Sequence, residues 1–406
     1  SVMVLFIIPV TLLGTVSPFA IRLAIQDPKE AGRISGRIYA ISTLGSFIGT
    51  FLPVLLMIPT IGTRNTFVVF SSYLVFVAII GMFMSVGWRG GLTYLWMLVF
   101  LVLLGIIWGN SPIKRSTGQI YESESAYNYI QVLEKDGYRF LRLNEGQGVH
   151  SEYHPVILDY HGSWMQVLSG PFFNEFPYEM NNIKNMAIIG LAGGTIARQA
   201  TAVFGEISID GYEIDPQIIN VGRRYFGMNM PNLNAIAADG RWGLAHSHDK
   251  YSIISIDAYR PPYIPWHLTT QEYFQIVHDH LTKDGVLVIN VGRAPNDRRL
   301  INGLIGTIST IFPSIYVMDV PYTFNSVIYA TVQSTNVMNL FNNYVVLKED
   351  PSTHPLLVES MERTLMNITD TPASEVVFTD DRAPIEWITN GMVLKYVLSG
   401  NLEDLQ

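Results

Sequence analysis

The fold is decided by the stretch Met186-Ala187-Ile188-Ile189-Gly190-Leu191-Ala192-Gly193-Gly194-Thr195. Its short apolar run is typical of a buried parallel strand. A glycine-rich turn and a helical pattern over residues 196–204 follow, so the amides of the turn lie at a helix N-terminus, where the backbone can approach a ligand. The stretch therefore predicts the first strand, loop and helix of a doubly wound α/β sheet.

More apolar strands alternate with helical patterns after this stretch. They are predicted at residues 206–212, 235–238, 251–256, 285–291 and 327–332. This alternation predicts right-handed crossovers and a parallel sheet. Three of the strands end on an acid, namely Glu213, Asp239 and Asp257. Carboxyl ends of parallel strands form one ligand-binding edge, so we expect these acids to meet there with Gly190, Gly193 and Gly194.

The spacing of these residues indicates an adenosine-type ligand. Glu213 lies 23 residues after Gly190, where a carboxylate can accept both hydrogen bonds of a ribose diol. The turn lacks the Gly-x-Gly-x-x-Gly period that grips a dinucleotide pyrophosphate. An acid such as Asp239 after the third strand suits an adenine amine. An S-adenosyl nucleoside, which has no phosphate, fits this pattern better than a nicotinamide dinucleotide.

Sequence patterns divide the chain into four parts. Residues 1–113 are expected to hold four transmembrane helices, and residues 114–180 a small β-rich domain with a hairpin around residues 135–137. A Rossmann-like nucleoside-binding domain is expected over residues 181–335. Residues 336–406 are expected to pack on it as a C-terminal extension.

The membrane prediction rests on four runs without any charged residue. They have 21, 26, 24 and 24 residues and cover residues 1–21, 38–63, 65–88 and 90–113. About 20 apolar residues span a bilayer core, so we expect a multi-pass protein of the cell (inner) membrane, in contact with lipid.

Charge and composition exclude several classes of function. Residues 1–110 carry a net charge of +4 and the remaining 296 residues carry −12. The acidic part argues against nucleic acid, whose phosphates need a basic face. The chain has no cysteine, and its histidines lack the spacing of a ligand set, so no metal site is expected. Asp380-Asp381 is interpreted as a solvated turn or an N-cap before Pro384 rather than a cation site.

Residues from about Tyr127 to the C-terminus resemble the spermidine synthase (aminopropyltransferase) family. The matching pieces are Tyr127, Gln147, residues 190–195, Glu213-Ile214-Asp215, Asp239-Gly240 and Asp257. Residues 32–40 and 379–384 are similar to its membrane-fused bacterial branch. The resemblance implies a small β-domain before an S-adenosylmethionine-methyltransferase-like Rossmann domain. It also implies that Glu213 binds the ribose of decarboxylated S-adenosylmethionine, Asp239 its adenine, and Gln147 the ribose or sulfur side.

Two departures from the family concern the amine chemistry. Soluble members carry two acids three residues apart after the fourth strand, and the second removes a proton from the attacking amine. Here Arg260 replaces that second acid, and a guanidinium cannot act as a base near neutral pH. Ala192 also stands where the family usually has an aspartate. Asp257 therefore remains as the catalytic candidate.

These observations predict a membrane-anchored protein that binds S-adenosylmethionine or its decarboxylated form without a tightly bound cofactor. It would transfer an aminopropyl group to an amine such as a polyamine. The alternative is a non-catalytic structural or assembly subunit of a membrane protein complex, and a methyltransferase for another acceptor is a third reading. Basic loop residues place the α/β part outside the cell, whereas its ligand class places it in the cytoplasm, which we favour.

Overall fold

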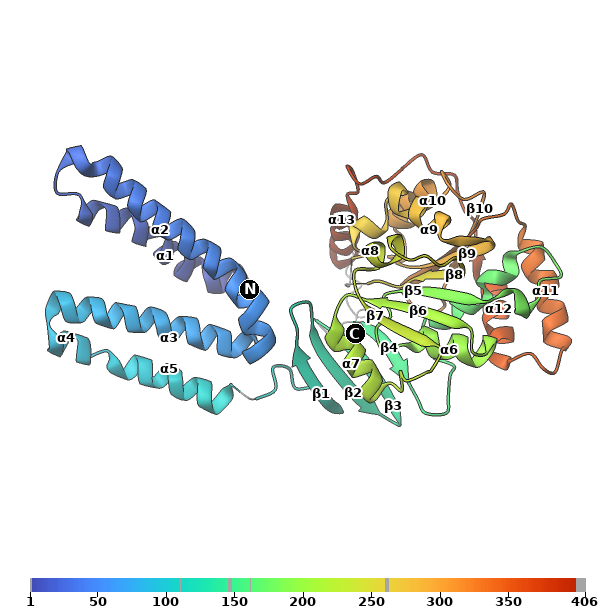
Figure 1. Cartoon of the computed structure of the whole chain (residues 1–406), viewed down its shortest axis with the longest axis horizontal. Coiled ribbons are helices and arrows are strands. Elements are labelled where there is room, and N and C mark those ends of the chain that lie inside the picture. Colours follow the sequence, from blue (N-terminus) through green and yellow to red (C-terminus); the bar gives the residue numbers. More distant parts are fainter. Residues whose placement is uncertain (1, 110, 145–147, 161, 260–262, 399–406) are drawn as a thin grey trace. The chain divides into compact units, whose positions relative to one another are not determined.

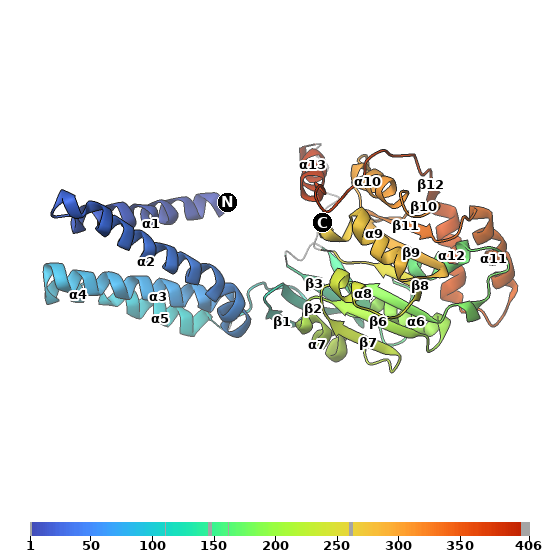
Figure 2. The same cartoon turned by 45° about the horizontal axis from the view of Figure 1, so that its top comes forward.

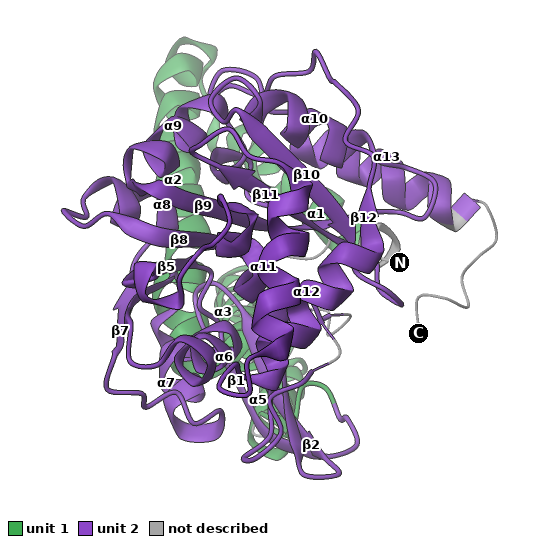
Figure 3. Cartoon of the chain, turned by 90° about the vertical axis from the view of Figure 1, so that its right-hand side faces the viewer, with its two compact units in different colours: residues 1–114 green, residues 115–406 purple. Residues whose placement is uncertain are grey.

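The computed structural model describes residues 2–109, 111–144, 148–160, 162–259 and 263–398. The chain divides into two compact units, residues 1–114 (unit 1) and residues 115–406 (unit 2), which Figure 3 colours separately.

The regular elements of unit 1 are all helical in its described residues. They are α1 (Val2–Ala24), the 3-10 helix η1 (Pro28–Glu30), α2 (Ala31–Leu52), a π-helical segment (Pro53–Met57), α3 (Ile58–Val86), α4 (Trp88–Leu92) and α5 (Leu95–Trp108). Helix α1 lies along α2, and α3 lies along α5 (Figures 1 and 2). The Arg64 guanidinium donates to the carbonyl oxygens of Trp108, Ser111 and Pro112, so this cation satisfies backbone acceptors where α5 ends.

Three helical stretches of unit 1 are long and apolar enough to cross a membrane: Phe6–Ala24, Pro28–Val86 and Trp88–Trp108. The second has 59 residues, and at 1.5 Å per residue it would be about three times as long as a bilayer core is thick. Its backbone leaves the helical region at Gly62, with φ 79° and ψ 163°. Large apolar side chains such as Leu23 and Ile106 are exposed, which is unusual for a protein surface in water.

Unit 2 begins with a four-stranded antiparallel sheet. Its strands are β1 (Gln119–Glu124), β2 (Tyr129–Lys135), β3 (Tyr138–Leu143) and β4 (Val149–Tyr153). Asp136 and Gly137 connect β2 to β3 and have φ of +53° and +84°, as a type I′ hairpin turn requires. The predicted hairpin is confirmed. Ile130, Val132 and Leu141 of this sheet pack against helix α7 (Pro216–Tyr225).

An eight-stranded sheet forms the centre of unit 2, in the order β12-β10-β11-β9-β8-β5-β6-β7. Its strands are β5 (Asn185–Ile189), β6 (Ser208–Glu213), β7 (Leu233–Ala237), β8 (Tyr251–Ile256), β9 (Leu281–Gly292), β10 (Ser314–Asp319), β11 (Asn325–Thr331) and β12 (Ile368–Thr369). Strand β5 pairs with both β6 and β8, so the direction of winding reverses there, at the switch point where doubly wound sheets bind ligands. The arrangement is that of an S-adenosylmethionine-methyltransferase-like Rossmann fold.

The predicted parallel sheet is confirmed for β5 to β9, but the predicted strand at residues 327–332 is antiparallel. Strands β5 to β9 are parallel, but β11 pairs antiparallel with both β9 and β10. Only residues 320–324 connect β10 to β11, and so short a connection permits an antiparallel pair alone. Strand β10 was missed in the sequence.

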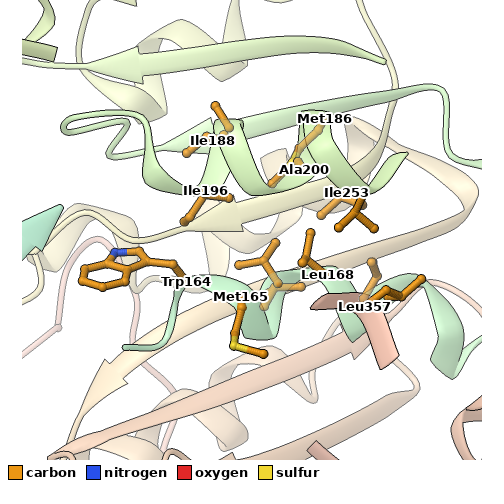
Figure 4. Close-up of a cluster of buried hydrophobic side chains, with 14 of the residues drawn as sticks. Trp164, Met165, Leu168, Met186, Ile188, Ile196, Ala200, Ile253 and Leu357 are labelled. Atoms are coloured by element: carbon orange, nitrogen blue, oxygen red, sulfur yellow. The ribbon is translucent and has the colours of Figure 1, made fainter. Parts of the chain in front are cut away.

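Helices cover both faces of the sheet. One face packs against η3 (Trp164–Phe173), α6 (Thr195–Phe204), α11 (Val337–Glu349) and α12 (Pro355–Asn367). Figure 4 shows Trp164, Met165 and Leu168 of η3 in this core. Ile188 of strand β5 and Leu357 of helix α12 belong to the same core. The other face packs against α8 (Gly240–Ala245), α9 (Gln271–Asp279), α10 (Arg299–Ile308) and α13 (Ile385–Leu398).

Candidate functional site

The glycine-rich loop after β5 is held in a conformation that glycine favours. Gly190, Ala192 and Gly194 all have positive φ, of +89°, +48° and +82°. A Cβ on Gly190 would lie 2.6 Å from the carbonyl oxygen of Asp257. Glycine at this position therefore lets the carboxyl ends of β5 and β8 approach each other closely.

The side chain of Glu213, at the end of β6, is hydrogen-bonded to this loop. Its carboxylate accepts hydrogen bonds from the amides of Ala192 (3.0 Å) and Asp215 (3.1 Å). The residue is only 7% exposed, and burial raises its pKa to about 7 against the opposing effect of the amides. Each carboxylate oxygen can accept more than one hydrogen bond, so the group can still receive hydroxyl donors of a ligand.

The small sheet fixes the loop from the opposite side. The Oγ of Ser151 on β4 accepts a hydrogen bond from the Gly193 amide at 2.7 Å. The Thr195 hydroxyl bonds both the amide and the carbonyl group of Glu152. Sequence reasoning missed Ser151, because nothing in its surrounding sequence marks it as a loop contact.

A second tie to the small sheet runs through Asp215, which is fully buried and caps the N-terminus of α7 through the Gln217 amide. Its carboxylate also accepts from the Ser125 hydroxyl at 2.5 Å and from the Asn128 side chain at 3.1 Å. The loop between β1 and β2 is thereby anchored at the carboxyl end of β6 in the large sheet.

Asp239 follows β7 and caps the N-terminus of α8 through the Trp242 amide (3.0 Å). Its other carboxylate oxygen lies 2.9 Å from Nε2 of His267. This hydrogen bond is the main cause that lowers the Asp239 pKa. Asp239 is thus a partly exposed carboxylate with both oxygens already engaged.

A short segment of the C-terminal extension, residues 379–382 (the strap), is hydrogen-bonded to helix α8 next to Asp239. Arg241 on α8 forms two hydrogen bonds of 2.7 Å with Asp380, and Thr270 donates a third to the same carboxylate. Arg241 also donates to the carbonyl oxygen of His267. Asp380 lies in an exposed turn, as predicted, and its carboxylate also forms an ion pair with Arg241, which the sequence did not indicate.

Asp257 lies at one wall of a cavity of about 480 Å³ at the carboxyl ends of β8 and β9. Its carboxylate accepts hydrogen bonds from Asn290 at 2.8 Å and from the Trp164 side chain. The surrounding protein desolvates the carboxyl and raises its pKa to about 6. A carboxylate with such a pKa can accept a proton near neutral pH.

Two residues that line this cavity, His150 and Asn290, each have a buried side-chain atom (Nε2 and Oδ1) without a hydrogen-bond partner, and the buried Nε of Arg293 lies 3.5 Å from the Asp319 carboxylate. Burial lowers the His150 pKa to about 4, so this imidazole is neutral at pH 7. Apolar walls come from residues such as Phe324, Met392 and Tyr396, the last two on α13. No sequence motif indicated these residues.

The loop residue Ala192 connects the two halves of the site. Its amide donates to Glu213, and the residue also lines the cavity that contains Asp257. Glu213 and Asp239 do not line this cavity. The structure thus joins the glycine loop with Glu213 and Asp257, and it places Asp239 at the next strand end with its side chain turned to His267.

Two residues of the sequence analysis, Gln147 and Arg260, lie outside the described residues. Among those that the structure describes, no three His, Asp or Glu side chains are grouped so that they could hold a metal ion.

The central part of the chain is similar to a known protein domain. A model of the spermine/spermidine synthase domain matches residues 174–343. The chain carries a spermidine synthase domain. The resemblance drawn from its motifs is confirmed, and the apolar helices of unit 1 are consistent with a membrane-fused member.

Curated relatives agree with this assignment. A probable polyamine aminopropyl transferase of Bifidobacterium longum is 29% identical over 286 residues, which cover 66% of this chain and 62% of that protein. A polyamine aminopropyltransferase of Vibrio vulnificus is 28% identical over 187 residues, covering 42% of this chain and 58% of the relative. The chain thus spans about six tenths of the length of these two relatives.

The chain is also similar to solved structures of spermidine synthases. A probable spermidine synthase from Corynebacterium glutamicum aligns with a TM-score of 0.49 at 16% identity, over 59% of this chain and 89% of that one. The spermidine synthase from Thermotoga maritima aligns with a TM-score of 0.46 at 20% identity, over 68% and 88%.

Proposed function

We propose that this spermidine synthase relative is a membrane-anchored aminopropyltransferase. It binds decarboxylated S-adenosylmethionine and transfers the aminopropyl group to an amine. The observation that carries the proposal is the position of Ala192, which contacts Glu213 on one side and lines the Asp257 cavity on the other. A nucleoside held at Glu213 would direct its side chain along this loop toward Asp257.

The nucleoside half is assigned by its hydrogen-bonding chemistry. Glu213 retains acceptor capacity for the ribose diol, and Gly190, Gly193 and Gly194 allow close approach of the backbone. Asp239 would accept the adenine amine in place of, or together with, His267. Gln147 is assigned to the ribose or sulfur side, as in the family motif. S-Adenosylmethionine itself is the related ligand to compare.

The acceptor half supplies the base. The amine nitrogen attacks the methylene carbon next to the sulfonium, the new C–N bond forms, and the C–S electron pair stays on sulfur as a neutral thioether. The proton lost by the nitrogen passes to Asp257. Its raised pKa, about 6, suits a group that takes a proton and returns it to solvent. This assignment needs no second acid at position 260.

The names of the relatives support the reaction class, since both curated proteins are polyamine aminopropyltransferases. The test uses the purified full-length chain in detergent. Calorimetry should detect binding of decarboxylated S-adenosylmethionine, and mass spectrometry should detect an aminopropylated product with a panel of primary amines. Absence of nucleoside binding would overturn the whole proposal. Nucleoside binding without product from any amine would overturn the transferase assignment and leave a non-catalytic binder.

Membrane anchoring is proposed from unit 1, with its exposed apolar side chains in contact with lipid and the domain on the cytoplasmic side of the cell membrane. S-Adenosyl nucleosides are made in the cytoplasm, so a retained ligand site favours that side. The chain has no cysteine, and Asp249 is exposed. An Asp249→Cys variant should therefore resist a membrane-impermeant maleimide in intact cells and react after lysis. Labelling in intact cells would place the domain outside.

A further inference from the structure

The cavity beside Asp257 has an uneven distribution of charge. Among its described lining residues, Asp257 is the only carboxylate and Arg293 the only permanent cation. His150 is neutral at pH 7 because burial lowers its pKa to about 4. The cavity therefore offers one negative group for an attacking amine and one positive group elsewhere on its wall.

The positive charge of Arg293 is only partly compensated. Its nearest acid is Asp319, at 3.5 Å from Nε. Asp319 already accepts two hydrogen bonds from Arg298, at 2.8 and 3.0 Å, and one from the Ser326 hydroxyl at 2.6 Å. Two guanidinium groups thus share one carboxylate. The next pair, Arg299 with Asp297, is neutral in itself, so the cluster retains a net positive charge.

Arg293 also has donor capacity to spare. One terminal nitrogen donates to the Thr323 carbonyl oxygen at 3.2 Å, and the buried Nε faces the shared Asp319 carboxylate at 3.5 Å without a well-formed hydrogen bond. A guanidinium is well suited to a carboxylate or a phosphate, because its planar donors match two oxygens at once.

We infer that the acceptor is a primary amine whose far end carries an anionic group. The inference rests on the proposed function and names its substrate class. The amine would lie at Asp257 and the anion at Arg293, which follows Asn290 by three residues of extended chain, about 10 Å. A diamine would instead place its second ammonium near a cation and the apolar side chains of Phe324 and Met392, with no carboxylate among the described lining residues to receive it.

The test compares acceptors of similar length with the full-length protein and decarboxylated S-adenosylmethionine. They are 4-aminobutyrate, 3-aminopropyl phosphate, butylamine and putrescine. We expect kcat/KM for the better anionic acceptor to exceed that for putrescine at least tenfold, with butylamine between them. The carboxylate and phosphate arms distinguish the two anion types. A preference of the native chain for putrescine would overturn the inference.

Variants at position 293 test whether Arg293 causes the preference for anionic acceptors. Arg293→Gln should remove most of the anion preference, and Arg293→Lys should retain it. Arg299→Gln is the matched control, because Arg299 pairs with Asp297 and does not line the cavity. An unchanged preference in a folded Arg293→Gln protein would overturn the inference. Failure of the proposed function is distinguishable, since no acceptor of any charge would then give a product, whereas failure of this inference alone leaves measurable transfer to putrescine.

Discussion

The two halves of the ligand edge differ in how far their polar groups are satisfied. On the nucleoside side, both oxygens of Glu213 and of Asp239 already accept hydrogen bonds from the protein. On the acceptor side, His150 and Asn290 each have a buried side-chain atom without a hydrogen-bond partner, and the buried Nε of Arg293 lies 3.5 Å from the Asp319 carboxylate. One half is held rigid by its own backbone, and the other has unused hydrogen-bonding capacity.

The difference teaches what each half is suited to do. A loop fixed by amide hydrogen bonds positions a ligand with little reorganisation. Asp257 instead lines a cavity of about 480 Å³, which leaves room for a substrate beside it. We therefore expect the Glu213 half to be preorganised and the Asp257 half to be completed by its substrate.

The largest effect on the difference between the two halves is expected from removal of the Glu213 carboxylate. Glu213→Ala should abolish measurable nucleoside binding, because a ribose diol would lose two charge-assisted hydrogen bonds of about 1.5–3 kcal/mol each. Titration calorimetry measures the effect. Glu206→Ala, which removes an exposed acid just before the same strand, is the control and should bind normally. Unchanged affinity in the Glu213 variant would reject the assignment of the nucleoside half.

Asp257→Asn tests the acceptor half alone. Loss of the general base should lower kcat about 100- to 10,000-fold while nucleoside affinity stays within a few-fold of the native value. Single-turnover transfer and calorimetry on the same preparation separate the two quantities. A variant with native kcat would show that another group takes the proton.

The two halves should also titrate differently. With a pKa of about 7 for Glu213, nucleoside affinity should rise about tenfold from pH 6 to pH 8 as the carboxylate forms. The transfer rate of the loaded protein should fall tenfold per pH unit below about 6, where Asp257 becomes protonated. Both carboxyls have raised pKa values in the folded state, so their contribution to stability is greatest below about pH 4 and is lost as the pH rises through 6 to 7. Coincident profiles for binding and transfer would contradict two separate groups.

The smallest effect is expected from the strap. Asp380→Asn removes the ion pair with Arg241, and a partly exposed pair contributes about 0.2–1 kcal/mol. Nucleoside affinity should weaken about two- to fivefold, because α8 and its capping residue Asp239 are held less firmly. Asp381→Asn, at the exposed neighbouring position, should have no effect. Equal effects of the two variants would show that the strap does not act through Arg241.

The sequence by itself determined the local features of this protein. The β2–β3 hairpin follows from its Asp136-Gly137 turn, and the parallel strands follow from short apolar runs, because turn chemistry and hydrophobic period act over a few neighbouring residues. Glu213 and Asp257 could be selected because each directly follows or ends such a strand. The long uncharged runs of unit 1 could also be recognised directly in the sequence.

Only the tertiary structure decided how distant segments complete the site. Ser151 reaches the loop across 42 residues, His267 reaches Asp239 across 28, and Asp380 reaches Arg241 across 139. Helix α13 and the connection between β10 and β11 bring Met392 and Phe324 to the cavity of Asp257 in the same way. Strand β10 also belongs here, since its antiparallel pairing depends on β11 and β12. Side-chain contacts of this kind depend on packing between remote elements, and no local pattern records them.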